Sequence, residues 1–337
     1  MTDAYIYESI RSPRTKAKAS GGLHELTPSE LLAQLYETLA ARQNLDPSVV
    51  SEVILGCVTQ YGEQAANIAK TSSLLAGWPT TISGMTLNRF CSSSIDAISL
   101  AALKVAAGHS SAVLAGGVEM MSRVPLMADR ARVFADHEYG VSHQVLLMGA
   151  GADLIAERVG ASRTDCDAVA YLSHQRALRA QREGRFTSVV PIKTSSGSVS
   201  LDECIRPSLT AERLAAMPPA FLTLGASGSD ALQLSQYPEL TKIAHVHTAG
   251  NSPAMCDAAA VLLVGSKMLA SDKGLIPKVR IVDSVTCCGE PLEVVSGCVA
   301  VTEKLLRDNR LSAHQVDLFE IHEAFAATVI KTRETLE

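Results

Sequence analysis

The stretch that decides the fold is Ser83-Gly-Met-Thr-Leu87 and, directly after it, Asn88-Arg-Phe-Cys91-Ser-Ser-Ser-Ile-Asp-Ala97. It predicts a strand over residues 83–87, a sharp turn, and a helix from Ser92 to about Ala107 with one cysteine at the junction. Small apolar residues recur along the helix, which is typical of a buried helix. A second strand is expected over 112–115, leading into Gly116-Gly-Val-Glu-Met-Met-Ser122. A strand, a helix and a further strand in this order indicate an α/β fold.

Cys91 is the candidate nucleophile of this stretch. A helix N-terminus carries unpaired N–H groups and a partial positive charge, which lower the pKa of a nearby thiol and favour the reactive thiolate. The alternative is a small buried thiol that only packs. The turn by itself leaves both interpretations open.

Composition excludes several classes of protein. The chain has 337 residues, of which 47% are hydrophobic and only 4% aromatic, and its net charge is −5. That length suffices for two core-forming units, and a core of aliphatic residues suits helices packed on a mostly parallel sheet. The acidic charge and the lack of a basic run argue against nucleic acid as a partner. No apolar run approaches a membrane span, and a strand expected from Ala4 leaves no room for a signal peptide, so a cytoplasmic location is expected.

The cysteines and histidines indicate neither a disulfide framework nor a metal site. Eight cysteines are scattered along the chain without a Cys-x-x-Cys pair, which is typical of reduced thiols. His245 and His247 are placed on one face of an expected strand, where they could form a metal pair. No third ligand is evident nearby, so no metal is expected.

Two segments look like copies of one βαβ unit. Each has a strand, an amphipathic helix, a short polar turn and another apolar strand, which predicts two stacked halves. Two unrelated βαβ units could also look alike by chance. The expected elements are strands over 5–10 and 53–56 around a helix over 29–42, and strands over 279–285 and 316–321 around a helix over 292–309. The second copy ends in the helix after Ile321, so its later strands are missing.

Between the copies, the polar stretch from Ser122 to about Ile243 is predicted to form an inserted lobe with helices over 148–159 and 164–183. A strand over 258–264 then returns to the first core.

The residues around Cys91 resemble the thiolase family of acyl-CoA acyltransferases, and the resemblance extends along nearly the whole chain. Its segments follow the family's order: Asn88 to Ser94, Gly116 to Ser122, Met148-Gly149 with Ala152, Ser173 to Ala177, Gly184 to Phe186, Ile205 to Pro207, Pro219 to Phe221, Thr248 to Ser252 and His322 to Ala326. The family's later Gly-His-Pro motif, whose histidine activates the nucleophile, and its Cys-x-Gly-Gly-Gly motif do not occur in this sequence. The resemblance therefore implies a chain that is truncated at its C-terminus and has very low activity on its own.

The resemblance also implies the architecture. We expect duplicated βαβαβαββ halves that form a layered αβαβα core, with an inserted loop domain and an incomplete second half. The expected limits are 1–121 with 248–273 for the N-terminal half, 122–247 for the inserted CoA-binding domain, and 274–337 for the start of the C-terminal half.

Two residues carry catalytic roles by resemblance. Cys91 would take the acyl group, and His322 would help to bind a water in an oxyanion hole for the thioester oxygen. Without the family, His322 at the end of an expected buried strand could be an ordinary core histidine.

Five residues are expected to bind coenzyme A, which is a substrate; no cofactor is expected. Arg206 would lie near the adenine and phosphate end, Ala249 would contact the pantetheine arm, and Met148 and Phe221 would form apolar walls. Pro253 stands where many relatives place a serine, and because proline lacks a hydroxyl and an N–H, that hydrogen bond should be lost. Without the family, Arg206 could be an ordinary solvated arginine, Met148 and Phe221 could be core residues of the lobe, and the loop that contains Ala249 could be only a turn.

The expected function is thiolysis of 3-ketoacyl-CoA or condensation of acyl-CoA with acetyl-CoA through a Cys91 acyl-enzyme. The alternative is a shortened, catalytically impaired homologue that binds acyl-CoA or serves as a partner subunit. A ketoacyl-synthase-like condensing enzyme is a weaker third interpretation. A homodimer or homotetramer is expected from the family, with a complex with a complementary subunit as the other arrangement.

Overall fold

The computed structural model describes residues 3–336, so the expected domain limits at residues 1 and 337 lie outside the described residues. The chain forms two compact units. Unit 1 consists of the described residues up to Asp129, of Gln181–Cys204 and of Met255–Val282. Unit 2 consists of Arg130–Ala180, Ile205–Ala254 and the described residues from Asp283 onward. The chain therefore leaves and re-enters unit 1 twice.

Unit 1 is built on one seven-stranded mixed sheet in the order β4-β3-β5-β8-β1-β9, with β2 paired to β8. β3 is parallel to both β4 and β5, whereas β8 is antiparallel to β5 and β1. The strands are β1 Ala4–Arg11, β2 Thr15–Lys16, β3 Glu52–Gly56, β4 Ser83–Leu87, β5 Ala112–Met120, β8 Cys256–Ser266 and β9 Val279–Ile281. The strands expected around the Cys91 stretch are therefore confirmed, and β5 runs five residues further than predicted.

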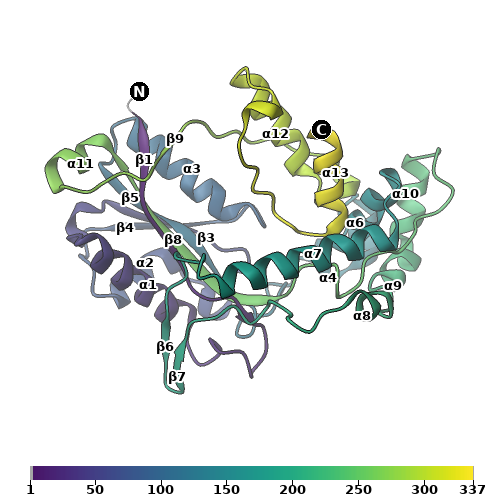
Figure 1. Ribbon diagram of the computed structural model, residues 1–337, viewed down its shortest axis with the longest axis horizontal. Coiled ribbons are helices and arrows are strands. Elements are labelled where there is room, and N and C mark those ends of the chain that lie inside the picture. The colour runs from purple at the N-terminus through teal and green to yellow at the C-terminus, as the bar shows by residue number, and fades with distance from the viewer. Residues whose placement is uncertain (1–2, 337) are drawn as a thin grey trace. The chain divides into compact units, whose positions relative to one another are not determined.

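Helices cover both faces of this sheet (Figure 1). Successive strand residues point to opposite faces, so Val53 and Leu55 join the core under α1 and α2, while Ile54 joins the smaller core under α3. The helices of unit 1 are α1 Pro28–Gln43, α2 Ile68–Leu75, α3 Ser93–Ala106 and α11 Lys267–Lys273, with 3₁₀ turns at Pro47–Val49 and Gly62–Gln64. The expected burial of α3 is confirmed on its alanine face, Ala97, Ala101 and Ala102.

Local signals in the sequence set the limits of the main helices. Thr27 and Glu30 form a capping box at the start of α1, Pro28 takes its first position, and Asn44 ends it in the left-handed conformation. The reciprocal bonds between Ser162 and Asp165 open α7, and Gly184, with φ +66°, follows its last turn.

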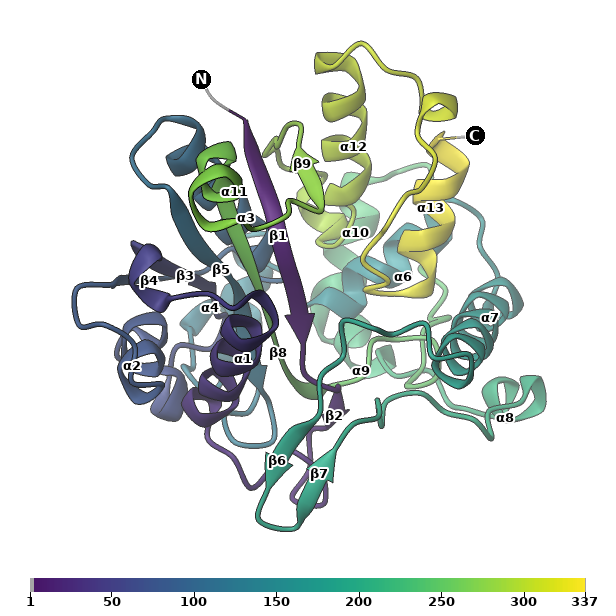
Figure 2. The ribbon, with the colours of Figure 1, turned by 60° about the vertical axis from the view of Figure 1, so that its left-hand side comes forward.

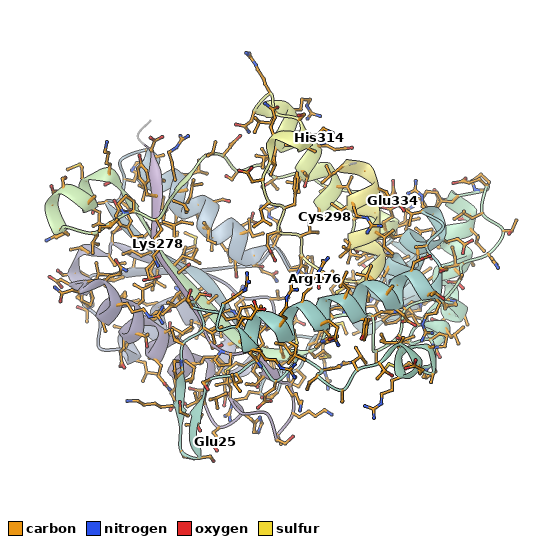
Figure 3. All side chains as sticks on the ribbon, viewed as in Figure 1. Glu25, Arg176, Lys278, Cys298, His314 and Glu334 are labelled. Atoms are coloured by element: carbon orange, nitrogen blue, oxygen red, sulfur yellow. The ribbon has the colours of Figure 1, made fainter. Side chains whose placement is uncertain are left out.

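A hairpin of β6 Ile192–Thr194 and β7 Gly197–Val199 completes unit 1. Glu25 lies at its tip (Figure 3), where its carboxylate accepts hydrogen bonds from Ser195 and Ser196. These bonds hold the pKa of Glu25 below its usual value. The hairpin is thus tied to the loop that precedes α1.

The regular secondary structure in the described residues of unit 2 is helical, and irregular segments join the helices. α13 packs on α6, and both contribute to one apolar cluster with Ile155 and Ile330 (Figure 2). The helices are α4 Arg132–Ala135, α5 His137–Ser142, α6 Met148–Arg158, α7 Arg163–Arg182 (its last two residues belong to unit 1), α8 Ala211–Ala215, α9 Leu222–Leu224, α10 Asp230–Gln236, α12 Gly297–Asp308 and α13 Ala326–Leu336, with a π turn at Gly225–Ser229 and 3₁₀ turns at Pro291–Glu293 and Ala313–Gln315.

The predicted second βαβ copy is only partly formed. The strand expected over 279–285 is shortened to β9, which pairs with β1 in the sheet of unit 1, and the helix expected over 292–309 begins at Gly297. The strand expected over 316–321 is wrong: this stretch is irregular, and Leu318 is 81% exposed. An apolar run becomes a strand only when a neighbouring strand accepts its backbone hydrogen bonds, and the described part of unit 2 offers none.

Candidate active site

Cys91 lies in a tight turn between β4 and α3 of unit 1. The Asn88 side chain accepts a hydrogen bond from the Phe90 N–H at 2.8 Å, and Phe90 has φ +48°, an uncommon conformation for an aromatic residue. The Ser93 hydroxyl accepts from the Arg89 N–H at 2.7 Å and donates to the Phe90 carbonyl at 2.6 Å. The turn that presents Cys91 is therefore held from both sides of the cysteine.

Two glycines allow the sheet to approach this turn. A Cβ on Gly56, the last residue of β3, would lie 2.5 Å from the backbone of Ser93. A Cβ on Gly117 in β5 would collide with the Ser94 hydroxyl. Both positions require glycine because the first turn of α3 rests directly on β3 and β5.

Glu119 supports the same region from β5. Its carboxylate accepts hydrogen bonds from the Val58 N–H at 2.9 Å and from the Gln64 side-chain amide at 2.6 Å. Asn88 donates in turn to the Val58 carbonyl at 3.1 Å. Glu119 was not predicted as a site residue, although it is the only charged residue in an otherwise apolar strand, and that was the signal available.

The thiol of Cys91 is less acidic than the sequence predicted. Although the residue is exposed, the protein around its sulfur removes enough water to raise the pKa of the thiol above its ordinary value, and the charge of Glu119 raises it further. The backbone N–H of Cys91 acts in the opposite direction but is weaker than burial. The expectation of a lowered pKa is therefore wrong, because desolvation of the thiolate outweighs the hydrogen bond from the Cys91 backbone N–H.

His322 belongs to unit 2 and precedes α13 in an exposed, irregular segment rather than a buried strand. Burial of its ring lowers the pKa of His322, and the neighbouring Glu323 charge acts against this. Glu323 accepts a hydrogen bond from the Ser173 hydroxyl at 2.6 Å. A neutral imidazole can donate a hydrogen bond from its ring N–H.

Phe325 anchors the segment that carries His322. Its ring makes edge contacts with Phe221, with centroids 5.9 Å apart, and with His247, at 5.4 Å. Met148 packs on the same cluster. Met148 and Phe221, the two residues predicted to form apolar walls for coenzyme A, are therefore brought together with the His322 segment.

Ala249 and Arg206 also meet within unit 2. The Arg206 guanidinium donates to the Ala249 carbonyl at 3.2 Å, at the exposed tip of the turn over 248–251. The Asn251 side chain closes this turn by accepting from the Thr248 N–H at 2.8 Å. Pro253 is exposed two residues beyond the turn.

Asp153 has a role that its place in the sequence did not reveal. Its buried carboxylate accepts a hydrogen bond from His245 and another from His247, each at Nδ1 and at 2.8 Å. His247 Nε2 accepts from the Ala327 N–H in the first turn of α13, at 3.4 Å. The two histidines therefore form a structural cluster with an aspartate, and the described residues contain no group of three or more His, Cys, Asp or Glu arranged to hold a metal ion.

Comparison with known proteins agrees with this geometry. The family model described as thiolase, N-terminal domain, matches residues 5–236, and that described as thiolase, C-terminal domain, matches residues 275–337. The chain belongs to the thiolase family. It is by family an acyl-CoA acyltransferase, and its mixed sheet with helices on both faces is the thiolase fold, as predicted. These matches do not favour the alternative of a non-catalytic homologue.

Individual thiolases are similar over nearly the whole chain. A 3-oxoadipyl-CoA/3-oxo-5,6-dehydrosuberyl-CoA thiolase of Escherichia coli K12 is 34% identical over 98% of this chain and 82% of its own length. A 3-ketoacyl-CoA thiolase of Colwellia psychrerythraea is 33% identical over 100% and 84%. The crystal structure of the Bacillus anthracis acetyl-CoA acetyltransferase superposes with a TM-score of 0.83 at 33% identity, covering 100% of this chain and 84% of that one. The dimeric peroxisomal thiolase of Saccharomyces cerevisiae gives 0.84 at 27% identity, covering 99% and 82%.

None of the helices within residues 3–336 has the length and apolar character that a membrane crossing requires.

Proposed function

We propose that this thiolase transfers acyl groups through a thioester on Cys91, in thiolysis of 3-ketoacyl-CoA or in condensation of acyl-CoA with acetyl-CoA. The observation that carries the proposal is the position of Cys91 at the braced turn where β4 meets α3. In thiolysis the Cys91 sulfur attacks the 3-keto carbon, the bond between carbons 2 and 3 breaks, and the acetyl-CoA carbanion takes a proton. The thiol of free CoA then removes the acyl group and restores Cys91.

The residues expected to bind acyl-CoA lie in unit 2. Met148 and Phe221 offer apolar surface beside the His322 segment, and His322 would support a water that donates to the thioester oxygen. Arg206 is a cation suited to the phosphates of CoA, next to Ala249 at the pantetheine arm. Because Pro253 offers no hydrogen-bond donor, we expect weaker binding of the pantetheine arm.

We further propose a homodimer or homotetramer in the cytoplasm, with no cofactor, metal or nucleic acid required. The structurally similar peroxisomal thiolase of Saccharomyces cerevisiae is dimeric, which supports a homo-oligomer here. Size-exclusion chromatography with light scattering measures the assembly directly, and a strictly monomeric chain would contradict this part of the proposal.

Covalent acylation of Cys91 tests the proposal without requiring turnover. The purified chain is incubated with acetyl-CoA, quenched in acid, digested and examined by mass spectrometry. We expect an acetyl group on the Cys91 peptide and its loss in Cys91→Ala. Cys288→Ser, which removes another exposed thiol, is the matched control and should leave the adduct unchanged. Equal acetylation of Cys91 and Cys288, or none on Cys91, would refute the proposed nucleophile.

A further inference from the structure

His247 connects the turn over 248–251 to the segment that carries His322, and all of these residues belong to unit 2. The His247 side chain is fully buried. Its ring lies edge-on to the ring of Phe325, with centroids 5.4 Å apart. Its Nε2 accepts a hydrogen bond from the Ala327 N–H at 3.4 Å. One buried side chain therefore contacts two residues of the segment that follows His322.

Asn251 joins the same two parts of the chain a second time. Its carbonyl accepts a hydrogen bond from the Ala326 N–H at 3.2 Å, and its side-chain amide donates to Asp167 at 2.8 Å. The first N–H groups of a helix have no partner within the helix. Here Asn251 and His247 bind two successive ones, those of Ala326 and Ala327, and so fix where α13 begins.

The position of His322 depends on this anchored helix start. His322 is exposed, whereas residues 324–328 are all buried. The His322 carbonyl accepts a hydrogen bond from the Ala324 N–H at 2.8 Å, which ties its backbone to the buried part. A movement of the buried residues would therefore displace the His322 imidazole as well.

Asp153 determines which ring nitrogen of His247 carries the proton. An ionised carboxylate can only accept, so Nδ1 of His247, at 2.8 Å from Asp153, must donate. Nε2 then keeps its lone pair, which the bond from the Ala327 N–H requires. His245 also binds Asp153, but its second ring bond goes to Asp230 rather than to the His322 segment.

We propose that His247 is a positioning residue for acyl transfer: held by Asp153, it fixes the start of α13 and thereby the place of His322. This inference rests on the proposed function, in which His322 supports the water that donates to the thioester oxygen. His247 is buried and acts only through the residues that follow His322. Its loss should slow acylation of Cys91 without preventing it.

The rate of Cys91 acetylation tests the proposal in the full chain. In His247→Asn the amide nitrogen can still donate to Asp153, but no atom replaces Nε2. The variant is mixed with saturating acetyl-CoA, quenched in acid at successive times and analysed by mass spectrometry. We expect the rate constant to fall about 10–100-fold, as for a catalytic group misplaced by about 1 Å, with an unchanged final extent. Misfolding alone would instead lower the final extent and leave the rate constant unchanged.

Two further variants separate positioning from a general structural effect. His245→Gln alters the other histidine on Asp153 and is the matched control, which should leave the rate constant unchanged. Because His247 acts through His322, His247→Asn should add no further loss in a His322→Ala background. Additive losses, or an unchanged rate constant in His247→Asn, would overturn the proposal.

Nitrogen-15 NMR of the histidine rings tests the positioning without acyl transfer. The unaltered chain should show a ring protonated at Nδ1 and not at Nε2, whose signals disappear in His247→Asn. The ring signals of His322, identified by their loss in His322→Ala, should shift in His247→Asn but not in His245→Gln. A proton on Nε2 of His247, or His322 signals that do not respond, would overturn the proposal. If the unaltered chain is not acetylated at all, the proposed function fails, whereas the ring signals still decide whether His247 positions His322.

Discussion

Replacing Asp153 by alanine should destabilise unit 2 by about 3–5 kcal/mol, the usual cost of removing one partner from a buried charged pair. The Asp153 side chain is fully buried and accepts three hydrogen bonds: from the His247 N–H at 3.1 Å and from Nδ1 of His247 and of His245 at 2.8 Å. Asp153→Ala would leave two hydrogen-bond donors of the equally buried His247 without a partner. Each unpaired donor costs about 1–3 kcal/mol of unfolding free energy, so these two together account for about 2–6 kcal/mol.

Urea unfolding followed by far-UV circular dichroism measures this loss as a shift of the midpoint. The matched control is Asp308→Ala, which removes an exposed aspartate paired only with helix neighbours and should change stability by less than about 0.5 kcal/mol. Asp153→Asn keeps the shape and one acceptor oxygen and should lie between the two. A loss below about 1 kcal/mol for Asp153→Ala, with a folded spectrum, would refute the energetic role assigned to this cluster.

The same cluster predicts a pH dependence. Burial lowers the pKa of His245, but the carboxylates of Asp153 and Asp230 outweigh burial, so the folded-state pKa lies above the ordinary value. The stability that protonated His245 contributes is therefore fully present below its unfolded pKa and is lost as pH rises through the folded one. The difference in unfolding free energy between the unaltered chain and His245→Gln should therefore shrink as pH rises through the folded-state pKa of His245. A difference independent of pH would contradict the raised pKa of His245.

Three further predictions concern unit 1. Gly56→Ala should cost about 1–3 kcal/mol, because the new methyl group meets the first turn of α3, and urea unfolding checks this. Asp202→Ala should cost about 3–5 kcal/mol by leaving Arg11 without its bidentate partner. Burial raises the pKa of Asp202, but Arg11 holds that pKa below its usual value. The stability that the Asp202–Arg11 pair contributes is therefore lost as pH falls through the folded-state pKa of Asp202. Acid unfolding of the unaltered chain and of Asp202→Ala would show this loss. Glu119→Gln should lower the pKa of the Cys91 thiol by removing a nearby charge, which the pH profile of iodoacetamide alkylation measures.

The sequence alone predicted best the structural features that depend on residues close together in the chain. The limits of β4 and α3 follow from a strand-like run, a polar turn and small residues at helical spacing, all within the stretch around Cys91. The capping residues Thr27 and Asn44 act on their own helix and could be read in the same way. Such signals need no knowledge of the rest of the chain.

Features that depend on residues far apart in the chain were not predicted from the sequence. The apolar run at 316–321 has a strand-like composition, but composition does not reveal whether a partner strand is present. Asp153 lies 92 residues from His245 and 94 from His247, so the pairing of both histidines with one buried carboxylate is invisible in sequence order. The raised pKa of Cys91 depends on the packing around its sulfur and on Glu119, and neither follows from its place before a helix.

The geometry and the pKa of Cys91 together limit how its chemistry can proceed. The turn is held by Asn88 and Ser93 and is supported through Val58 by Glu119, so the sulfur is well positioned. The same surroundings keep the thiol protonated near neutral pH, because burial and the Glu119 charge both disfavour the thiolate. Position without deprotonation gives slow acylation. The rate at which acetyl-CoA acylates Cys91 should therefore rise as pH increases toward the raised pKa, and Glu119→Gln should move that rise to lower pH. A rate independent of pH across neutrality would show that the thiolate already exists at rest.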